Sequence, residues 1–162
     1  MEPLDHPESF HLRAAQGWFE LGNCAEASAE LERLGKSGSQ HPAVLELRWQ
    51  IAVKNRLWEE GLAIAETLCQ AAPESSFGGI HRAYCLHELK RTKEAWDILL
   101  PLAEKFPEEW LICYNLACYA CQLGQLTEAR AWLMRAIERG DPREINRLAA
   151  EDPDLKPLSK PG

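Results

Sequence analysis

The chain has 162 residues, of which 46% are hydrophobic and 27% are charged, and its formal net charge is -7. The length is that of about one ordinary domain, and the composition excludes a disordered chain. The acidic balance gives no electrostatic reason to bind nucleic acid or an anionic membrane, so we expect neither partner.

Residues 1–7 are polar and contain two prolines, so we expect a disordered or extended N-terminus there. This segment lacks the basic start and apolar core of a signal peptide. No stretch approaches the length of apolar residues that a membrane-spanning helix needs. The simplest expected location is the cytoplasm, where the six cysteines would be reduced thiols.

A repeat dominates the chain from its first helix onward. Four segments contain a glutamate followed by a residue with a small side chain or none, and the step between them is 34 residues: Glu26–Ala27, Glu60–Gly61, Glu94–Ala95 and Glu128–Ala129. A tiny residue lets two helices approach closely. A glutamate in the first turn of a helix is favoured by the helix dipole. The repeat therefore predicts helical hairpins.

The hydrophobic spacing agrees with helices, and no segment alternates over strand length. We expect eight main helices, at about residues 8–21, 24–36, 42–54, 58–71, 75–89, 92–105, 109–123 and 126–139. Gly22 and Gly124 suit the left-handed turn after a first helix. Arg56 and Lys90 stand at the equivalent positions and can face the carbonyl end of the preceding helix.

A capping helix is expected after the last hairpin. Asp141 can cap its start, Pro142 suits its first turn, and Ile145 and Leu148 form a narrow apolar stripe. The proline-containing segment 152–158 is expected to end helical structure, with Leu155 and Leu158 folding back. Residues 159–162 are expected to be disordered.

The period of 34 and the helix–turn–helix content resemble the tetratricopeptide-repeat (TPR) family, whose pattern is W-x2-L-G-x2-Y…A-x3-F…P. Leu116, Ala117 and Ala120 stand in the first half of that pattern, and Ala129 with Leu133 in the second. The resemblance implies an all-α fold: a right-handed α-solenoid of four repeats (about 8–41, 42–75, 76–109 and 110–141), then a capping helix and tail at 142–158.

The sequence also departs from the family pattern. The family's tryptophan is absent, Trp49 stands where a small residue is usual, and Arg48 and Arg82 stand where leucine is usual. We therefore expect the second repeat to pack with a wider gap.

The resemblance further implies that the first helices of the repeats line a concave groove that holds a peptide or a partner protein. The chain would then be an adaptor or scaffold and not an enzyme, with no cofactor. The groove residues on this register are Leu12, Gln16, Phe19, Glu46, Gln50, Val53, Phe77, His81, Tyr84, His87, Leu111, Tyr114, Asn115, Cys118 and Cys121. Of these we expect Phe77, Tyr84 and Tyr114 to be the aromatic anchors, although aromatic residues at helical spacing also serve as packing between helices.

The groove's expected chemistry limits the partner. Some grooves of this kind clamp an acidic tail with two cationic side chains, but the corresponding positions here hold Leu12, Gln16, Gln50, Phe77 and His81. Acidic tails of cytosolic heat-shock chaperones are therefore not expected partners. A narrower possibility is a secretion-type chaperone, and the oligomeric state, monomer or weak dimer, stays open.

An alternative function is a metal-binding or redox module. Cys118 and Cys121 form a C-x-x-C, with His81 and His87 on the preceding first helix. Thiolates and imidazoles suit zinc. However, the pair lies in the middle of a helix, where no dipole stabilises a thiolate, and cysteine also packs well between close helices. No nucleophile-elbow, phosphate-loop or metalloprotease motif occurs.

Overall fold

A computed structural model describes residues 4–159, and within this range every regular element is a helix. The elements are α1 (Glu8–Glu20), α2 (Cys24–Glu32), the 3-10 helix η1 (Gly38–Gln40), α3 (Pro42–Lys54), α4 (Trp58–Ala71), α5 (Phe77–Glu88), α6 (Thr92–Lys105), α7 (Trp110–Gln122), α8 (Leu126–Arg139), α9 (Pro142–Glu151) and the 3-10 helix η2 (Pro153–Ser159). The predicted all-α fold is confirmed.

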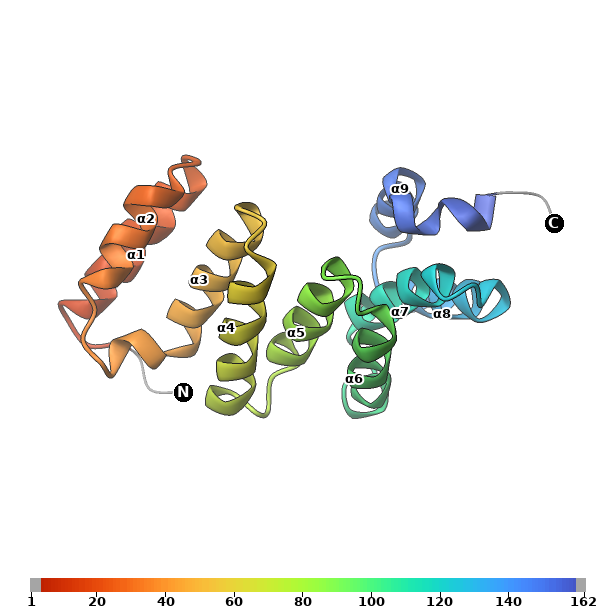
Figure 1. Cartoon of the computed structure of the whole chain (residues 1–162), viewed down its shortest axis with the longest axis horizontal. Helices are drawn as coiled ribbons and strands as arrows, with labels where there is room; N and C mark the ends of the chain where they lie inside the picture. The colour runs from red at the N-terminus through yellow and green to blue at the C-terminus, as the bar shows by residue number, and fades with distance from the viewer. Residues whose placement is uncertain (1–3, 160–162) are drawn as a thin grey trace. The chain divides into compact units, whose positions relative to one another are not determined.

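Successive helices form hairpins, α1 with α2, α3 with α4, and α7 with α8 (Figure 1). Each of the four first helices ends in the same left-handed turn: φ is 84° at Gly22, 57° at Arg56, 64° at Lys90 and 77° at Gly124. At Lys90, for example, the amide donates to the carbonyl of His87 at 2.9 Å, and the next amide donates to Leu86 at 2.8 Å. This pair of bonds is a Schellman motif, which satisfies the last carbonyls of a helix. Arg56 and Lys90 thus adopt the backbone that glycine adopts in the other two repeats.

The tiny residues of the repeat are buried as predicted. Ala27, Ala95 and Ala129 have no exposed surface, and Gly61 is also buried. The second helices also bury large rings, since Trp96 and Trp132 pack edge to face with centroids 6.4 Å apart. The tryptophans of α6 and α8 therefore serve as packing between helices.

The predicted end of the second helix was wrong. The helix α2 ends at Glu32 and not near residue 36, and a loop with η1 follows. This loop packs closely on α1, since the amide of Gly35 donates to Glu8 Oε1 at 3.1 Å. A Cβ atom at Gly38 would lie 2.6 Å from the carboxyl group of Glu8. The contact of Gly35 and Gly38 with Glu8 therefore takes the place of the last predicted turn of α2.

The chain divides into two compact units, residues 1–81 (unit 1) and residues 82–162 (unit 2). The core of unit 1 is built from Ala15, Ala27, Leu31, Leu34, Val44, Leu47 and Ile51. Leu4 packs against this core, and the carbonyl of Asp5 accepts from the amide of Ser9, so residues 4–7 lead directly into α1. Residues 1–3 of the segment expected to be disordered or extended lie outside the described range.

Open space lies beside Arg48 in the second repeat, for which we expect a wider gap. A cavity of about 170 Å³ lies beside Arg48, between α2, α3 and α4. The guanidinium of Arg48 donates to the carbonyl of Leu31 at 3.2 Å and so links α3 to the end of α2.

The capping helix α9 begins as predicted. Asp141 accepts from the amides of Arg143 and Glu144, and Ile145 is fully buried. We expected helical structure to end at residue 152. This was wrong, because Pro153 begins the 3-10 helix η2. Proline fits there, since the first turn of a helix needs no amide donor. Leu155 is only 3% exposed, so the segment folds back as predicted. We call residues 152–159 the strap. Of the residues expected to be disordered, Ser159 belongs to η2 and 160–162 lie outside the described range.

Candidate functional site

In unit 1, the predicted groove residues of α1 and α3 lie in different environments. Leu12 and Phe19 pack against the core, and the ammonium group of Lys54 lies 4.7 Å from the centre of the Phe19 ring. Gln16 is exposed and Val53 is half-buried. Leu12 and Phe19 therefore contribute to packing, whereas Gln16 does not.

The other predicted residues of unit 1 form a cluster around His81. Its ring stacks on Trp49, with centroids 3.6 Å apart and planes 10° apart, and lies 6.1 Å from the ring of Phe77. Its Nε2 atom lies 2.9 Å from both carboxylate oxygens of Glu46, which also accepts from Gln50 at 3.3 Å. Phe77 is 53% exposed. This cluster joins an exposed aromatic side chain to a polar network.

The pKa of Glu46 reflects this network. Burial raises the pKa of the carboxyl group, but the hydrogen bond and the charge of His81 outweigh burial, so the pKa lies below its ordinary value. Glu46 is therefore ionised at neutral pH and holds the imidazole in place.

In unit 2, α5, α7 and the junction of α9 with the strap surround a pocket of about 510 Å³. Its aromatic walls are Tyr84, Trp110 and Tyr114, and the last two pack edge to face at 6.2 Å. Leu111 and Asn115 also line it. Four of the predicted groove residues therefore meet here, namely Tyr84, Leu111, Tyr114 and Asn115. The sequence did not predict Trp110, the first residue of α7.

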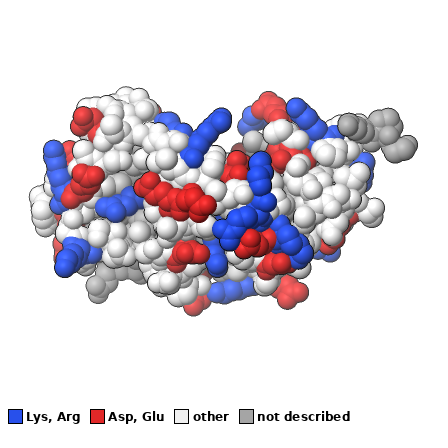
Figure 2. All heavy atoms as spheres, in the orientation of Figure 1, with Lys and Arg blue, Asp and Glu red and all other residues white. Residues whose placement is uncertain are grey.

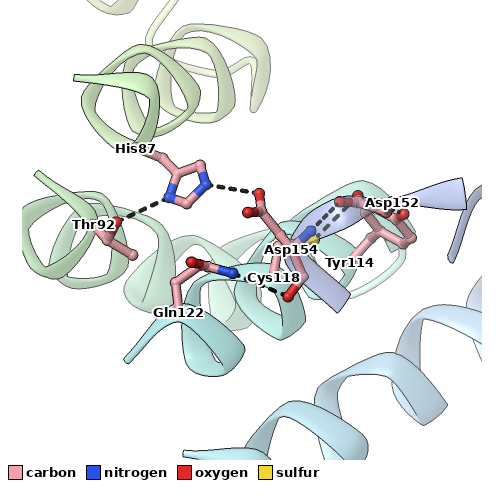
Figure 3. A network of polar contacts seen from close by, with 7 residues as sticks. All are labelled: His87, Thr92, Tyr114, Cys118, Gln122, Asp152 and Asp154. Carbon is pink, nitrogen blue, oxygen red and sulfur yellow. Dashed lines mark hydrogen bonds and ion pairs between the residues drawn. The ribbon is translucent and has the colours of Figure 1, made fainter. Parts of the chain in front are cut away.

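The strap is bound to the neighbouring surface by a network of polar contacts (Figure 3). Tyr114 donates its hydroxyl to Asp152 Oδ2 at 2.9 Å, and the thiol of Cys118 donates to the same oxygen at 3.6 Å. Asp154 Oδ2 lies 2.8 Å from Nε2 of His87, and its carbonyl accepts from Gln122 at 3.2 Å. Two carboxylates of the tail thus face side chains of α5 and α7.

The network closes part of the predicted groove. His87, Tyr114, Cys118 and Cys121 are each less than a tenth exposed. Three of them contact the chain's own strap, and of the four only Tyr114 also lines the pocket. Tyr84, Leu111 and Asn115 stay partly exposed beside them. The open part of the site is therefore the pocket.

The thiols of the C-x-x-C lack the environment of reactive cysteines. Burial raises the pKa of Cys118, and the nearby Asp152 and Asp154 raise it further. Burial also raises the pKa of Cys121. Reactive thiols need a lowered pKa. Both groups therefore stay protonated at neutral pH and serve as small apolar packing residues.

The two histidines that were considered with these thiols have other partners. Nε2 of His81 faces Glu46, while Nε2 of His87 faces Asp154. Among residues 4–159, no three side chains of His, Cys, Asp or Glu are grouped as a metal site would need.

Charge is unevenly distributed around the pocket. Four carboxylates line it, those of Glu88, Glu151, Asp152 and Asp154. No Lys or Arg of the described chain lines it. Unit 2 as a whole is nearly balanced, with 12 Lys or Arg and 13 Asp or Glu in residues 82–162. Both signs are interspersed over the face that Figure 2 shows. The acidic character is therefore local to the pocket.

No helix among the described residues is both long and apolar enough to cross a membrane. No family model and no curated protein matches the sequence.

Solved structures with the same fold do match. TTC0263, a thermophilic TPR protein of Thermus thermophilus, superposes with a TM-score of 0.75 at 21% identity, over 93% of this chain and 80% of that one. MamA MSR-1 superposes with a TM-score of 0.68 at 19% identity, over 87% and 82%. YrrB, described as a TPR protein with an unusual peptide-binding site, superposes with a TM-score of 0.65 at 14% identity, over 91% of this chain and 80% of that one.

Proposed function

Because the chain has the all-α fold of these TPR solenoids, we propose that it is a protein–protein interaction module that binds a peptide segment of a partner protein. The observation that carries the proposal is the pocket of unit 2, which places three aromatic rings around an open space of about 510 Å³. Aromatic side chains dominate the binding energy of protein interfaces, because they bury much area at a low entropic cost.

The scaffold around the pocket is suited to this role. Trp110 and Tyr114 lie on α7, whose inner face is fully buried, and the ring of Trp110 lies close to Gly140 and Ile145. A preformed surface loses little conformational entropy when it binds. The likeness to YrrB, described as having a peptide-binding site, supports the same class of function.

The cluster around His81 is proposed as a further contact surface, in unit 1. Phe77 offers an exposed ring there, beside the polar groups of Glu46 and Gln50. Polar groups around an aromatic anchor are typical of interface rims.

Comparison of three baits tests the proposal. These are the wild type, the pocket variant Tyr84→Ala/Leu111→Ala and the control variant Phe10→Ala/Trp18→Ala, which removes exposed rings of α1. A partner recovered from source lysate is purified and its affinity for each chain is measured. We expect the pocket variant to bind at least about tenfold more weakly, as truncated anchors do, and the control to bind like the wild type. Equal affinity of a folded pocket variant would show that this pocket is not the binding site.

A further inference from the structure

The pocket of unit 2 combines two features that favour the same ligand. Among the described residues, its rim carries four carboxylates and no cation, in a unit whose charges otherwise nearly balance. Its walls carry three aromatic rings, whose faces attract cations through their quadrupole. Each feature would occur alone in many proteins, but together they are complementary to a positively charged group that also has an apolar stem.

The four carboxylates have different roles. Asp152 and Asp154 are already bound, to Tyr114 and to His87, and belong to the strap. Glu151 pairs with Arg147 only at 3.9 Å, and both side chains are more than half exposed, so this pair is weak. Glu88 faces the pocket from α5. Its charge, after burial, is the next largest cause that raises the pKa of Tyr84. Glu88 and Glu151 are therefore the carboxylates that remain for a ligand.

We propose that the pocket of unit 2 receives a lysine or arginine side chain from an extended segment of the partner protein. The aliphatic stem would lie against the rings of Tyr84 and Trp110, and the charged head would face Glu88 and Glu151. This inference deepens the proposed function and rests on it, since it names the chemistry of the peptide that the same pocket binds.

The charges also argue against an acidic peptide in this place. A carboxylate in the pocket would face four others, of which only Glu151 has an arginine partner, the weakly paired Arg147, and repulsion between like charges opposes binding. The strap's own aspartates do not occupy the pocket's open space, because neutral donors of α7 and the imidazole of α5 hold them at its wall.

The test uses the full chain, labelled with nitrogen-15, and three synthetic tripeptides. The probes are acetyl-Leu-Arg-Leu-amide, the same peptide with citrulline, and the same peptide with glutamate. Citrulline has the shape of arginine but no charge. We expect the arginine peptide to shift the indole signal of Trp110 and the amide signals of Tyr84 and Asn115. Its dissociation constant should be at least about tenfold lower than that of the citrulline peptide, as expected for a charge between carboxylates and aromatic rings.

Two matched variants separate a local effect from net charge. Glu88→Gln/Glu151→Gln removes two pocket carboxylates, and Glu128→Gln/Glu138→Gln removes two exposed ones on α8. We expect the pocket variant to bind the arginine peptide at least about fivefold more weakly and the α8 variant to bind it like the wild type, because screened charges act over short distances. Both variants should stay folded, which their melting curves check, since Glu128, Glu138 and Glu151 are exposed and Glu88 is only partly buried.

The outcomes distinguish the inference from the proposed function. If the citrulline or glutamate peptide binds the pocket as tightly as the arginine peptide, the cationic preference is refuted and peptide binding is kept. If both charge variants weaken binding equally, the preference belongs to net charge and the inference is also refuted. If no peptide of any charge shifts the pocket signals, neither the inference nor the pocket's role in binding survives.

Discussion

At the scale of single residues, the turn after each first helix is a place where the sequence is not optimal for its structure. Gly22 and Gly124 adopt a positive φ without cost, whereas Arg56 and Lys90 adopt it with a Cβ atom. The left-handed conformation costs a residue with a side chain about 1–2 kcal/mol. The repeat therefore offers its own control, since four equivalent turns differ in this residue.

We predict that Lys90→Gly raises the free energy of unfolding by about 0.5–1 kcal/mol, because relief of the backbone strain exceeds the entropy cost of glycine. Gly124→Ala should lower it by about 1 kcal/mol, for the same reason in reverse. No atom lies within 4 Å of a Cβ at that glycine, so only the backbone is tested. Urea unfolding measures both values. A loss of stability in Lys90→Gly would mean that the lysine side chain stabilises the helix end by more than the strain costs.

Glu46 gives a prediction about pH. Its pKa is lowered below 4.5 in the folded chain, so its stabilising effect is complete above the unfolded value and is lost as the pH falls through the folded value. We expect the free energy of unfolding of the wild type to exceed that of Glu46→Gln by about 1 kcal/mol at neutral pH, which is typical of one hydrogen bond. The difference should shrink below pH 4.5. Unfolding of both chains across the acid range measures it, and a constant difference would contradict the assignment.

At the scale of helices, the repeat decided what the sequence could predict. The other seven predicted helices lie within about two residues of their positions because one local pattern recurs four times, within the usual error of such bounds. The early end of α2 could not be predicted, because it depends on Glu8 meeting Gly38 across the hairpin. The helix η2 was missed because its prolines indicate the end of a helix, although a first turn accepts proline.

Ala95 tests the close packing that the repeat predicts. It is fully buried in the first turn of α6, so a tryptophan there would overpack the hairpin. We predict that Ala95→Trp lowers the free energy of unfolding by about 1–3 kcal/mol or more. The control is Asp97→Trp, which adds the same ring at an exposed position of the same helix. Equal unfolding curves for the two variants would contradict the packing at Ala95.

Only part of the candidate site could be predicted from the sequence, because the repeat pattern does not show contacts between distant residues. The family's geometry predicted Tyr84, Leu111, Tyr114 and Asn115 as groove residues, and these four line one pocket. It could not show that His87 meets Asp154, which is 67 residues away. One signal was available: Asp152 follows Cys118 by one period of 34, so the end of α9 continues the register of α7 as a fifth first helix would.

At the scale of the whole molecule, the acidic balance is mainly a property of unit 1. Residues 1–81 contain 12 Asp or Glu and 6 Lys or Arg, whereas residues 82–162 are nearly neutral. The net charge of -7 therefore says little about the pocket of unit 2, whose acidity comes from four carboxylates. A partner with a basic segment would be attracted by the chain in general and held at the pocket in particular.

The reactivity of one thiol, that of Cys118, should report whether the strap is closed or open. Cys118 is 5% exposed and donates to Asp152, so we expect an alkylating reagent to attack it mainly when the strap has lifted. We expect iodoacetamide to modify Cys118 far more slowly than Cys24 or Cys69, which are partly exposed. Leu155→Ala removes a buried side chain of the strap without changing a charge near the thiol, and it should accelerate the reaction at least about tenfold, since reaction of a protected group follows the population of the open form. Mass spectrometry of the time course would then give the opening equilibrium of the tail, and an unchanged rate would show that the helix, not the strap, protects the thiol.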